Sequence, residues 1–146
     1  MALTALDYLK DFMADAPLRE ANCKRCCREV SALKNRQDIL HLLADYTASL
    51  KAIYGTALSK VILYGSYARG DYTDDSDIDV MLLLDVSPEE ERRDLDRLAE
   101  ITSTFNIDND VYIMPLPKSR KTFVKWEGID PFYKNVNREG VVLFDA

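Results

Sequence analysis

The chain has 146 residues, of which 47% are hydrophobic and 30% are charged, and its formal net charge is −6. This length suits one domain with a substantial core and is too short for two. The negative net charge argues against an extended surface for DNA or RNA, because such surfaces are strongly basic. A small anionic ligand remains compatible with it, since a bound cation reverses the local field.

Nothing in the sequence indicates export or membrane insertion. The N-terminus lacks a basic start followed by an apolar run, and no stretch approaches the roughly 18 apolar residues of a membrane span. The three cysteines, at positions 23, 26 and 27, are crowded together, whereas a disulfide framework spreads cysteines along the chain. We therefore predict a cytoplasmic protein without a membrane partner.

The first part of the chain is predicted to be helical, and the remainder alternates between helices and strands. Residues 3–14 and 18–33 are the first two predicted helices, separated at Pro17, and we treat residues 1–35 as an N-terminal helical extension of unassigned role. Residues 36–146 are the predicted main domain. Its predicted fold class is α/β, because one sheet covered by helices buries the apolar runs economically.

The elements of the main domain follow from periodicity and from local signals. Apolar residues at helical spacing begin after Asn35 and end at Gly55, as expected of a helix with a glycine C-cap. Ser87 opens a capping-box sequence with proline at the first helical position. In chain order, we predict a helix over 35–55, strands over 61–65 and 78–84, a helix over 88–104, a strand over 110–116, short helices over 119–126 and 131–137, and a strand over 141–144.

The turn at Gly65 and Ser66 is the first candidate for chemistry. A strand that ends in Gly-Ser and turns into a helix exposes unpaired backbone N–H groups at one place, and the helix N-terminus adds a favourable field for an anion. Glycine lets the backbone approach a phosphate closely, and the Ser66 hydroxyl can donate to another oxygen. Alone, a Gly-Ser turn is more often only a turn, so it needs further support.

Asp77 and Asp79 are the second candidate. Residues two apart in a strand point to the same side, with Cα atoms about 6.6 to 6.8 Å apart, so both carboxylates project from one face. Side by side they repel each other, and a divalent cation removes that cost. Such oxygen ligands suit Mg²⁺, and two metals could clamp the attacking and leaving oxygens of a displacement. The alternatives are a solvated acidic turn and a calcium loop, but Val80 and Val86 occupy positions where that loop requires glycine and glutamate.

A third carboxylate is expected at the start of the strand predicted over 110–116. Asp108 and Asp110 both lie on the same side of that strand as Tyr112. Asp110 is the better candidate because it adjoins the apolar run, and the choice between the two stays open. It could bind a second metal and accept the proton of an incoming hydroxyl.

Together, the segments GSYARG and SDIDVMLLL resemble the polymerase-beta-like nucleotidyltransferase superfamily, and more narrowly the minimal nucleotidyltransferases that are paired with HEPN proteins. The family motif is Gly-Ser, a spacer and Asp-x-Asp, and the spacer here is the ten residues from Tyr67 to Ser76. The tail PFYKNVNREGVVLF is also similar to the end of such proteins. The resemblance covers about residues 36–146 and implies a mixed sheet flanked by helices.

The resemblance implies Mg²⁺-dependent transfer of a nucleotidyl group from an NTP, expected to be ATP, at a site with two metals. The implied residues are, for the nucleotide, Gly65, Ser66 and Arg69, and, for metals and catalysis, Asp77, Asp79 and Asp110. Arg69 matches the arginine of the family motif and either meets phosphate or braces the turn.

The leading functional hypothesis is an antitoxin that adds AMP to a hydroxyl, expected to be a tyrosine, on a HEPN partner protein. It follows from the resemblance and from size, because larger relatives carry a second domain that recognises a small molecule or tRNA. One alternative is transfer to a small acceptor such as an aminoglycoside, with a homo-oligomer completing the site. Another is a partner-masking module without catalysis, which the intact carboxylates argue against, since retaining like charges has a cost.

Overall fold

The computed structural model describes residues 35–146. In chain order the elements are α3 (Arg36–Tyr54), the 3-10 helix η2 (Gly55–Ala57), β1 (Leu58–Tyr64), α4 (Ser66–Arg69), β2 (Ile78–Leu84), α5 (Leu95–Asn109), β3 (Ile113–Ser119), α6 (Arg120–Trp126), α7 (Pro131–Glu139) and β4 (Val141–Asp145). The helices predicted over 3–14 and 18–33 and the cysteine cluster lie outside the described residues. Within residues 35–146, no helix has the length and apolar character needed to cross a membrane.

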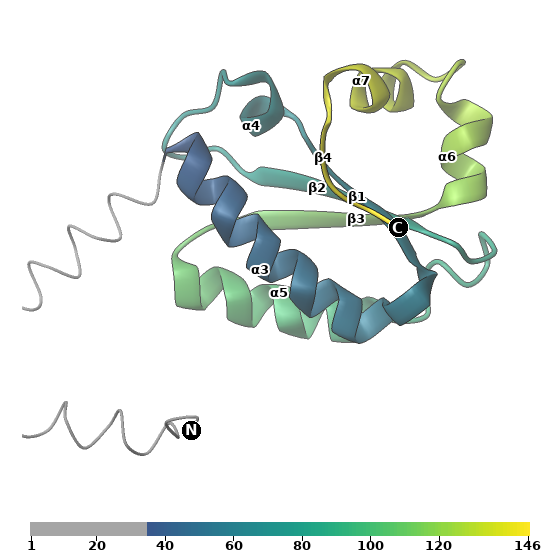
Figure 1. Cartoon of the computed structure of the whole chain (residues 1–146), viewed down its shortest axis with the longest axis horizontal. Helices are drawn as coiled ribbons and strands as arrows, with labels where there is room; N and C mark the ends of the chain where they lie inside the picture. Colours follow the sequence, from purple (N-terminus) through teal and green to yellow (C-terminus); the bar gives the residue numbers. More distant parts are fainter. Residues whose placement is uncertain (1–34) are drawn as a thin grey trace, which may run out of the picture. The chain divides into compact units, whose positions relative to one another are not determined.

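The strands of the described domain form one mixed sheet in the order β3-β2-β1-β4 (Figure 1). β1 pairs antiparallel with both β2 and β4, and β2 pairs parallel with β3. Helices α3 and α5 lie on one side of the sheet, and α6 and α7 lie on the other (Figure 1). The predicted α/β class, with a mixed sheet flanked by helices, is confirmed.

Helix α3 has the ends that the sequence predicts. The side-chain oxygen of Asn35 accepts from the backbone N–H groups of Gln37 (2.9 Å) and Asp38 (3.0 Å), which have no partner within the helix. At the other end, Gly55 adopts a positive φ of 53° and donates its N–H to the Lys51 carbonyl. These two caps fix the length of the helix that packs against β1 and β4.

Each side of the sheet has its own apolar cluster. The larger one joins α3 and α5 to the strands and includes Ile39, Leu43, Tyr46, Leu50, Val61, Leu63, Val80, Leu82 and Leu98. The smaller one joins α6 and α7 to the strands and consists of Ile62, Met81, Leu83, Phe123 and Val136. Because strand residues alternate between the two sides, Tyr64 and Asp79 lie on the α6–α7 side, with Ile62 and Met81.

The helix predicted to start at residue 88 begins instead at Leu95, and the segment before it forms successive turns. The Glu90 carboxylate does accept from the Ser87 N–H (3.3 Å), as the capping-box sequence predicts. However, the Glu91 carboxylate accepts from the Ser119 N–H at the end of β3 (2.8 Å). This contact holds the segment against the sheet, and the regular helix starts only after it.

Strand β3 begins at Ile113, later than predicted, because α5 runs to Asn109 and its C-cap occupies the first position of the predicted strand. Asp110 ends α5 in the left-handed conformation, with a φ of 52°. The Asn106 side chain then accepts from the Ile113 N–H (2.9 Å) and donates to the Ile113 carbonyl (3.2 Å). Pro115 and Pro117 are tolerated in β3 because it is an edge strand.

Candidate active site

The Gly65-Ser66 turn joins β1 to α4 and has a backbone that only glycine adopts readily. Gly65 has a φ of 74° and a ψ of −152°, and Ser66 begins the single helical turn of α4. That turn is closed by two backbone hydrogen bonds, from the Arg69 N–H to the Gly65 carbonyl (3.1 Å) and from the Gly70 N–H to the Ser66 carbonyl (2.8 Å). The first N–H groups of α4 therefore point away from the helix, as the predicted anion cradle requires.

The Asp79 carboxylate lies against Gly65. In the antiparallel pairing of β1 with β2, Asp79 stands opposite Tyr64, the residue before the turn. A Cβ atom on Gly65 would overlap the Asp79 Oδ2 atom and would lie 3.3 Å from its Cγ. The sheet register thus brings the second aspartate of the Asp-x-Asp pair to the Gly-Ser turn.

Asp77 and Asp79 form a close pair of like charges. Asp77 is exposed immediately before β2, and Asp79 is half-buried at the second position of the strand. Burial, and next the negative charge of Asp77, raise the pKa of the Asp79 carboxyl, while the positive charge of Arg69 opposes the shift. Among residues 35–146, neither aspartate makes an ion pair with a lysine or arginine.

The loop between α4 and β2 is fastened at both ends, which limits where Asp77 can lie. The Tyr72 ring stacks on the buried Tyr67 ring of α4, with centroids 4.3 Å apart. Further along, the Ser76 hydroxyl accepts from the Thr73 N–H (2.8 Å). The carboxylate of Asp77 is therefore presented by an ordered turn, although it is exposed.

Two aromatic side chains, Tyr64 and Phe132, lie beside Asp79 on the α7 side. Burial, and next the charge of Asp79, raise the pKa of Tyr64 to about 12, so its phenol stays protonated at neutral pH. The Phe132 ring of α7 packs edge-on against Tyr64, with centroids 5.6 Å apart, and remains partly exposed. On the other side, Met114 of β3 stands next to Asp79 in the parallel register and is exposed.

The predicted third carboxylate, Asp110, does not lie in a strand. Asp110 caps α5 and does not belong to β3. The alternation of side chains in a strand, which predicted that Asp110 and Tyr112 share one side, therefore does not apply here. Asp108 belongs to α5 and lines a shallow hollow with Ser49 of α3, on the opposite side of the sheet from Asp79. In the described part of the chain, no group of three or more aspartate, glutamate, histidine or cysteine side chains is arranged to hold a metal ion.

The nucleotidyltransferase domain family matches residues 46–135, which span the Gly-Ser turn, the Asp-x-Asp strand, β3, all of α6 and the first part of α7. The chain belongs to this family. The resemblance to minimal nucleotidyltransferases of the polymerase-beta-like superfamily is thereby confirmed, and the protein is a nucleotidyltransferase enzyme, as predicted.

Two proteins of Methanocaldococcus jannaschii are similar to this nucleotidyltransferase, and each bears the name "Putative protein adenylyltransferase". One is 33% identical over 105 residues, which cover 70% of this chain and 94% of the relative. The other is 32% identical over 79 residues, which cover 54% of this chain and 78% of the relative. A crystal structure of a "putative nucleotidyltransferase" from Sulfolobus solfataricus is 22% identical, with a TM-score of 0.46, over 79% of this chain and 87% of that one.

The Arg69 side chain of this nucleotidyltransferase contacts the loop after α4 and the end of α7. Its Nε donates to the Asp71 carboxylate (3.2 Å), which ties the end of α4 to the loop that follows. Its Nη1 also lies 3.9 Å from Glu139 Oε2, at the end of α7. Sequence reasoning missed Tyr64 and Glu139, although Tyr64 directly precedes the Gly-Ser pair and Glu139 belongs to the tail segment that resembles the family.

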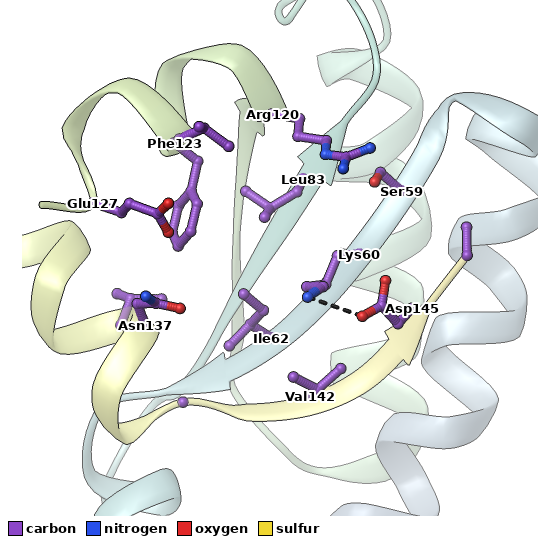
Figure 2. Close-up of a pocket in the computed structure, with 14 residues that line it drawn as sticks. Ser59, Lys60, Ile62, Leu83, Arg120, Phe123, Glu127, Asn137, Val142 and Asp145 are labelled. Atoms are coloured by element: carbon purple, nitrogen blue, oxygen red, sulfur yellow. Dashed lines mark ion pairs between the residues drawn. The ribbon is translucent and has the colours of Figure 1, made fainter.

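A separate cavity of about 340 Å³ lies on the α6–α7 side of the sheet, beside the end of β4 (Figure 2). Buried side chains of the smaller apolar cluster, such as Leu83 and Phe123, line it. Lys60 at its rim pairs with Asp145 (2.9 Å), as the dashed line in Figure 2 marks. None of the predicted site residues lines this cavity, so it is distinct from the candidate active site.

We predict that Gly65→Ala destabilises the protein more than Gly70→Ala does. Gly70 is in the left-handed region, whereas Gly65, with its ψ of −152°, is in a region that essentially only glycine adopts. In addition, a Cβ at Gly65 would overlap the Asp79 carboxylate, and a Cβ at Gly70 would meet nothing. Gly70→Ala should cost about 1 kcal/mol, and Gly65→Ala more than about 2 kcal/mol, measured by urea unfolding. Equal costs for the two variants would contradict the close approach of Asp79 to the turn.

Proposed function

We propose that this nucleotidyltransferase transfers the adenylyl group of ATP to a hydroxyl on a partner protein, with Mg²⁺ as cofactor. One observation carries the proposal. The Asp79 carboxylate lies against Gly65, so a cation held by Asp77 and Asp79 would stand next to phosphates held by the Gly65-Ser66 turn. Placing cation and phosphate side by side is what nucleotidyl transfer requires.

The donor set fits Mg²⁺. Mg²⁺ binds proteins through one or two carboxylates and completes its shell with water and substrate phosphates. Asp77 and Asp79 supply two carboxylates at a solvent-accessible edge. Among the described residues neither makes an ion pair, and the charge of Arg69 offsets their repulsion only in part. Bound there, Mg²⁺ would offset that repulsion and polarise the α-phosphate.

The residues of the turn would bind the triphosphate. The N–H groups at the start of α4 and the Ser66 hydroxyl are donors suited to phosphate oxygens. Arg69 brings a positive charge that already acts on Asp79. In the reaction, the acceptor oxygen forms a bond to the α-phosphorus, the bond from that phosphorus to the oxygen of the β-phosphate breaks, and pyrophosphate leaves.

Asp110 is proposed as the third carboxylate, which takes the proton from the acceptor hydroxyl. The segment before β3 runs beside Asp77, because the Ile78 N–H donates to the Tyr112 carbonyl (2.7 Å). Asp110 is therefore at the correct end of the sheet. The proposal requires the Asp110 carboxylate to reach the acceptor hydroxyl when nucleotide and cation are bound.

The proposed acceptor is a protein. Each of the two Methanocaldococcus relatives bears the name "Putative protein adenylyltransferase". Together with the resemblance to HEPN-associated minimal nucleotidyltransferases, this supports a tyrosine of a HEPN-type protein as the target and an antitoxin role. Transfer to an aminoglycoside and partner masking without catalysis are the competing functions.

We predict that Asp77→Asn and Asp79→Asn each lower adenylyl transfer by at least about 100-fold, because both remove a charged ligand of the proposed metal. The assay incubates the protein with Mg²⁺ and ATP labelled at the α-phosphate, together with a HEPN-type protein from the same genome or with kanamycin. Chelation of Mg²⁺ should stop transfer by the wild type. Both variants should remain folded, as judged by thermal unfolding.

The three functions give different results in this assay. Label on the protein acceptor supports the proposal, and label only on kanamycin supports the small-molecule alternative. If label appears on neither acceptor while the chain still binds the HEPN-type protein, the masking module is correct. Full transfer by the Asp79→Asn variant would refute the assignment of the site.

We also predict that Asp110→Asn lowers transfer at least about tenfold, whereas Asp108→Asn leaves it unchanged. The two variants remove the same charge from positions two residues apart, but Asp108 faces the α3 side of the sheet. The readout is the initial rate of transfer at saturating ATP. Loss of activity in Asp108→Asn alone would reverse the assignment.

A further inference from the structure

Arg69 and Glu139 connect two segments that are far apart in the sequence. Arg69 ends α4 within the GSYARG segment, and Glu139 ends α7 within the tail sequence Arg-Glu-Gly. The Arg69 Nη1 atom lies 3.9 Å from Glu139 Oε2, while its Nε donates to Asp71. The guanidinium therefore sits between two carboxylates, one in the loop after α4 and one on the helix across from it.

Helix α4 presents Arg69 toward α7 because of its anchoring. Tyr67 is buried in the cluster on the α3–α5 side of the sheet. Residues two apart on an α-helix are about 200° apart around the axis. With Tyr67 fixed in the core, Arg69 points to the opposite side, where the end of α7 lies.

Glu139 is held more firmly than its partner. Gly140, the next residue, packs so closely on β1 that a Cβ there would overlap the Ile62 side chain. Val136, one turn earlier in α7, is buried in the smaller cluster. The Glu139 side chain is 31% exposed, against 46% for that of Arg69. The end of α7 therefore provides a fixed point for a more exposed arginine.

The charge of Glu139 is also balanced locally. Arg138 donates to its other carboxylate oxygen, Oε1, at 2.6 Å. Arg69 meets Oε2, so the two arginines bind different oxygens of one carboxylate. Because Arg138 neutralises the negative charge of Glu139, Glu139 can hold Arg69 without repelling a triphosphate bound nearby.

We propose that Glu139 is a positioning residue, which holds the Arg69 guanidinium beside the Gly65-Ser66 turn where a triphosphate would bind. This inference rests on the proposed function, because it gives Arg69 a phosphate to meet. Asp71 alone would draw the guanidinium toward the exposed loop, whereas Glu139 holds it over the turn. The tail segment Arg-Glu-Gly would then be part of the nucleotide site.

The test measures nucleotide binding without turnover, by calorimetric titration of α,β-methylene-ATP in the presence of Mg²⁺. Glu139→Gln should weaken binding about three- to fivefold, the scale of a partly exposed ion pair. Arg69→Ala should weaken it at least as much, and the double variant should bind no more weakly than Arg69→Ala alone. In the transfer assay, the same loss should appear in KM for ATP and not in kcat.

Glu127→Gln is the matched control. Glu127 is a half-buried carboxylate at the end of α6, on the same side of the sheet, and it lines the separate cavity (Figure 2). Its substitution should leave binding of the analogue unchanged. Thermal unfolding of Glu139→Gln should match the wild type, which separates positioning from a structural role.

The outcomes distinguish this inference from the function on which it rests. If the wild type does not bind the analogue with Mg²⁺, the proposed function fails. If the wild type binds but Glu139→Gln binds equally well, only the positioning role fails. It also fails if Glu139→Gln weakens binding by the same factor when Arg69 is already alanine, since the two residues would then act independently.

Discussion

The structure depends on one electrostatic constraint: the Asp79 carboxylate is held against the Gly65 backbone with the Asp77 charge beside it. The antiparallel register of β1 and β2 imposes the contact, because Tyr64 and Asp79 are cross-strand partners. The apolar residues that follow Asp79 in β2 are buried, so the strand cannot slide to move Asp79 away from Gly65 without exposing them. Only a glycine leaves room for the carboxylate at the turn. The site is therefore strained electrostatically while the rest of the fold is well packed.

The two sides of the sheet have different roles: one supports the candidate site, and the other leaves it accessible. Helices α3 and α5 cover one side with the larger apolar cluster, which fixes β1, β2 and, through Tyr67, helix α4. On the other side, α6 and α7 cover only part of the sheet, and the Asp79 end stays accessible, with Phe132 and Met114 partly exposed around it. A nucleotidyltransferase needs this asymmetry, because rigid support on one side lets the other side accept substrate.

Much of the fold and of the site could be predicted from the sequence. Strand 78–84 follows from its apolar run, and the Asp79 contact with the turn follows from the motif spacing together with hairpin-like pairing. The predicted start of β3 was wrong, because α5 runs to Asn109 and the Asn106 side chain binds Ile113, the first residue of the strand. Hydrophobic periodicity does not reveal a hydrogen bond of this kind. The Glu139–Arg69 contact joins segments that no local pattern relates, since it depends on how α7 packs against β1.

The most direct measurement of the central claim is the free energy of unfolding of the wild type and Asp79→Asn as a function of pH, without divalent cations. The folded-state pKa of Asp79 is raised, so its ionised form destabilises the fold, and the wild type should lose stability relative to the variant as pH rises through that pKa. At pH 7 the asparagine variant should be the more stable protein, and Mg²⁺ should narrow the difference. A variant less stable than the wild type at pH 7 without Mg²⁺ would contradict the account.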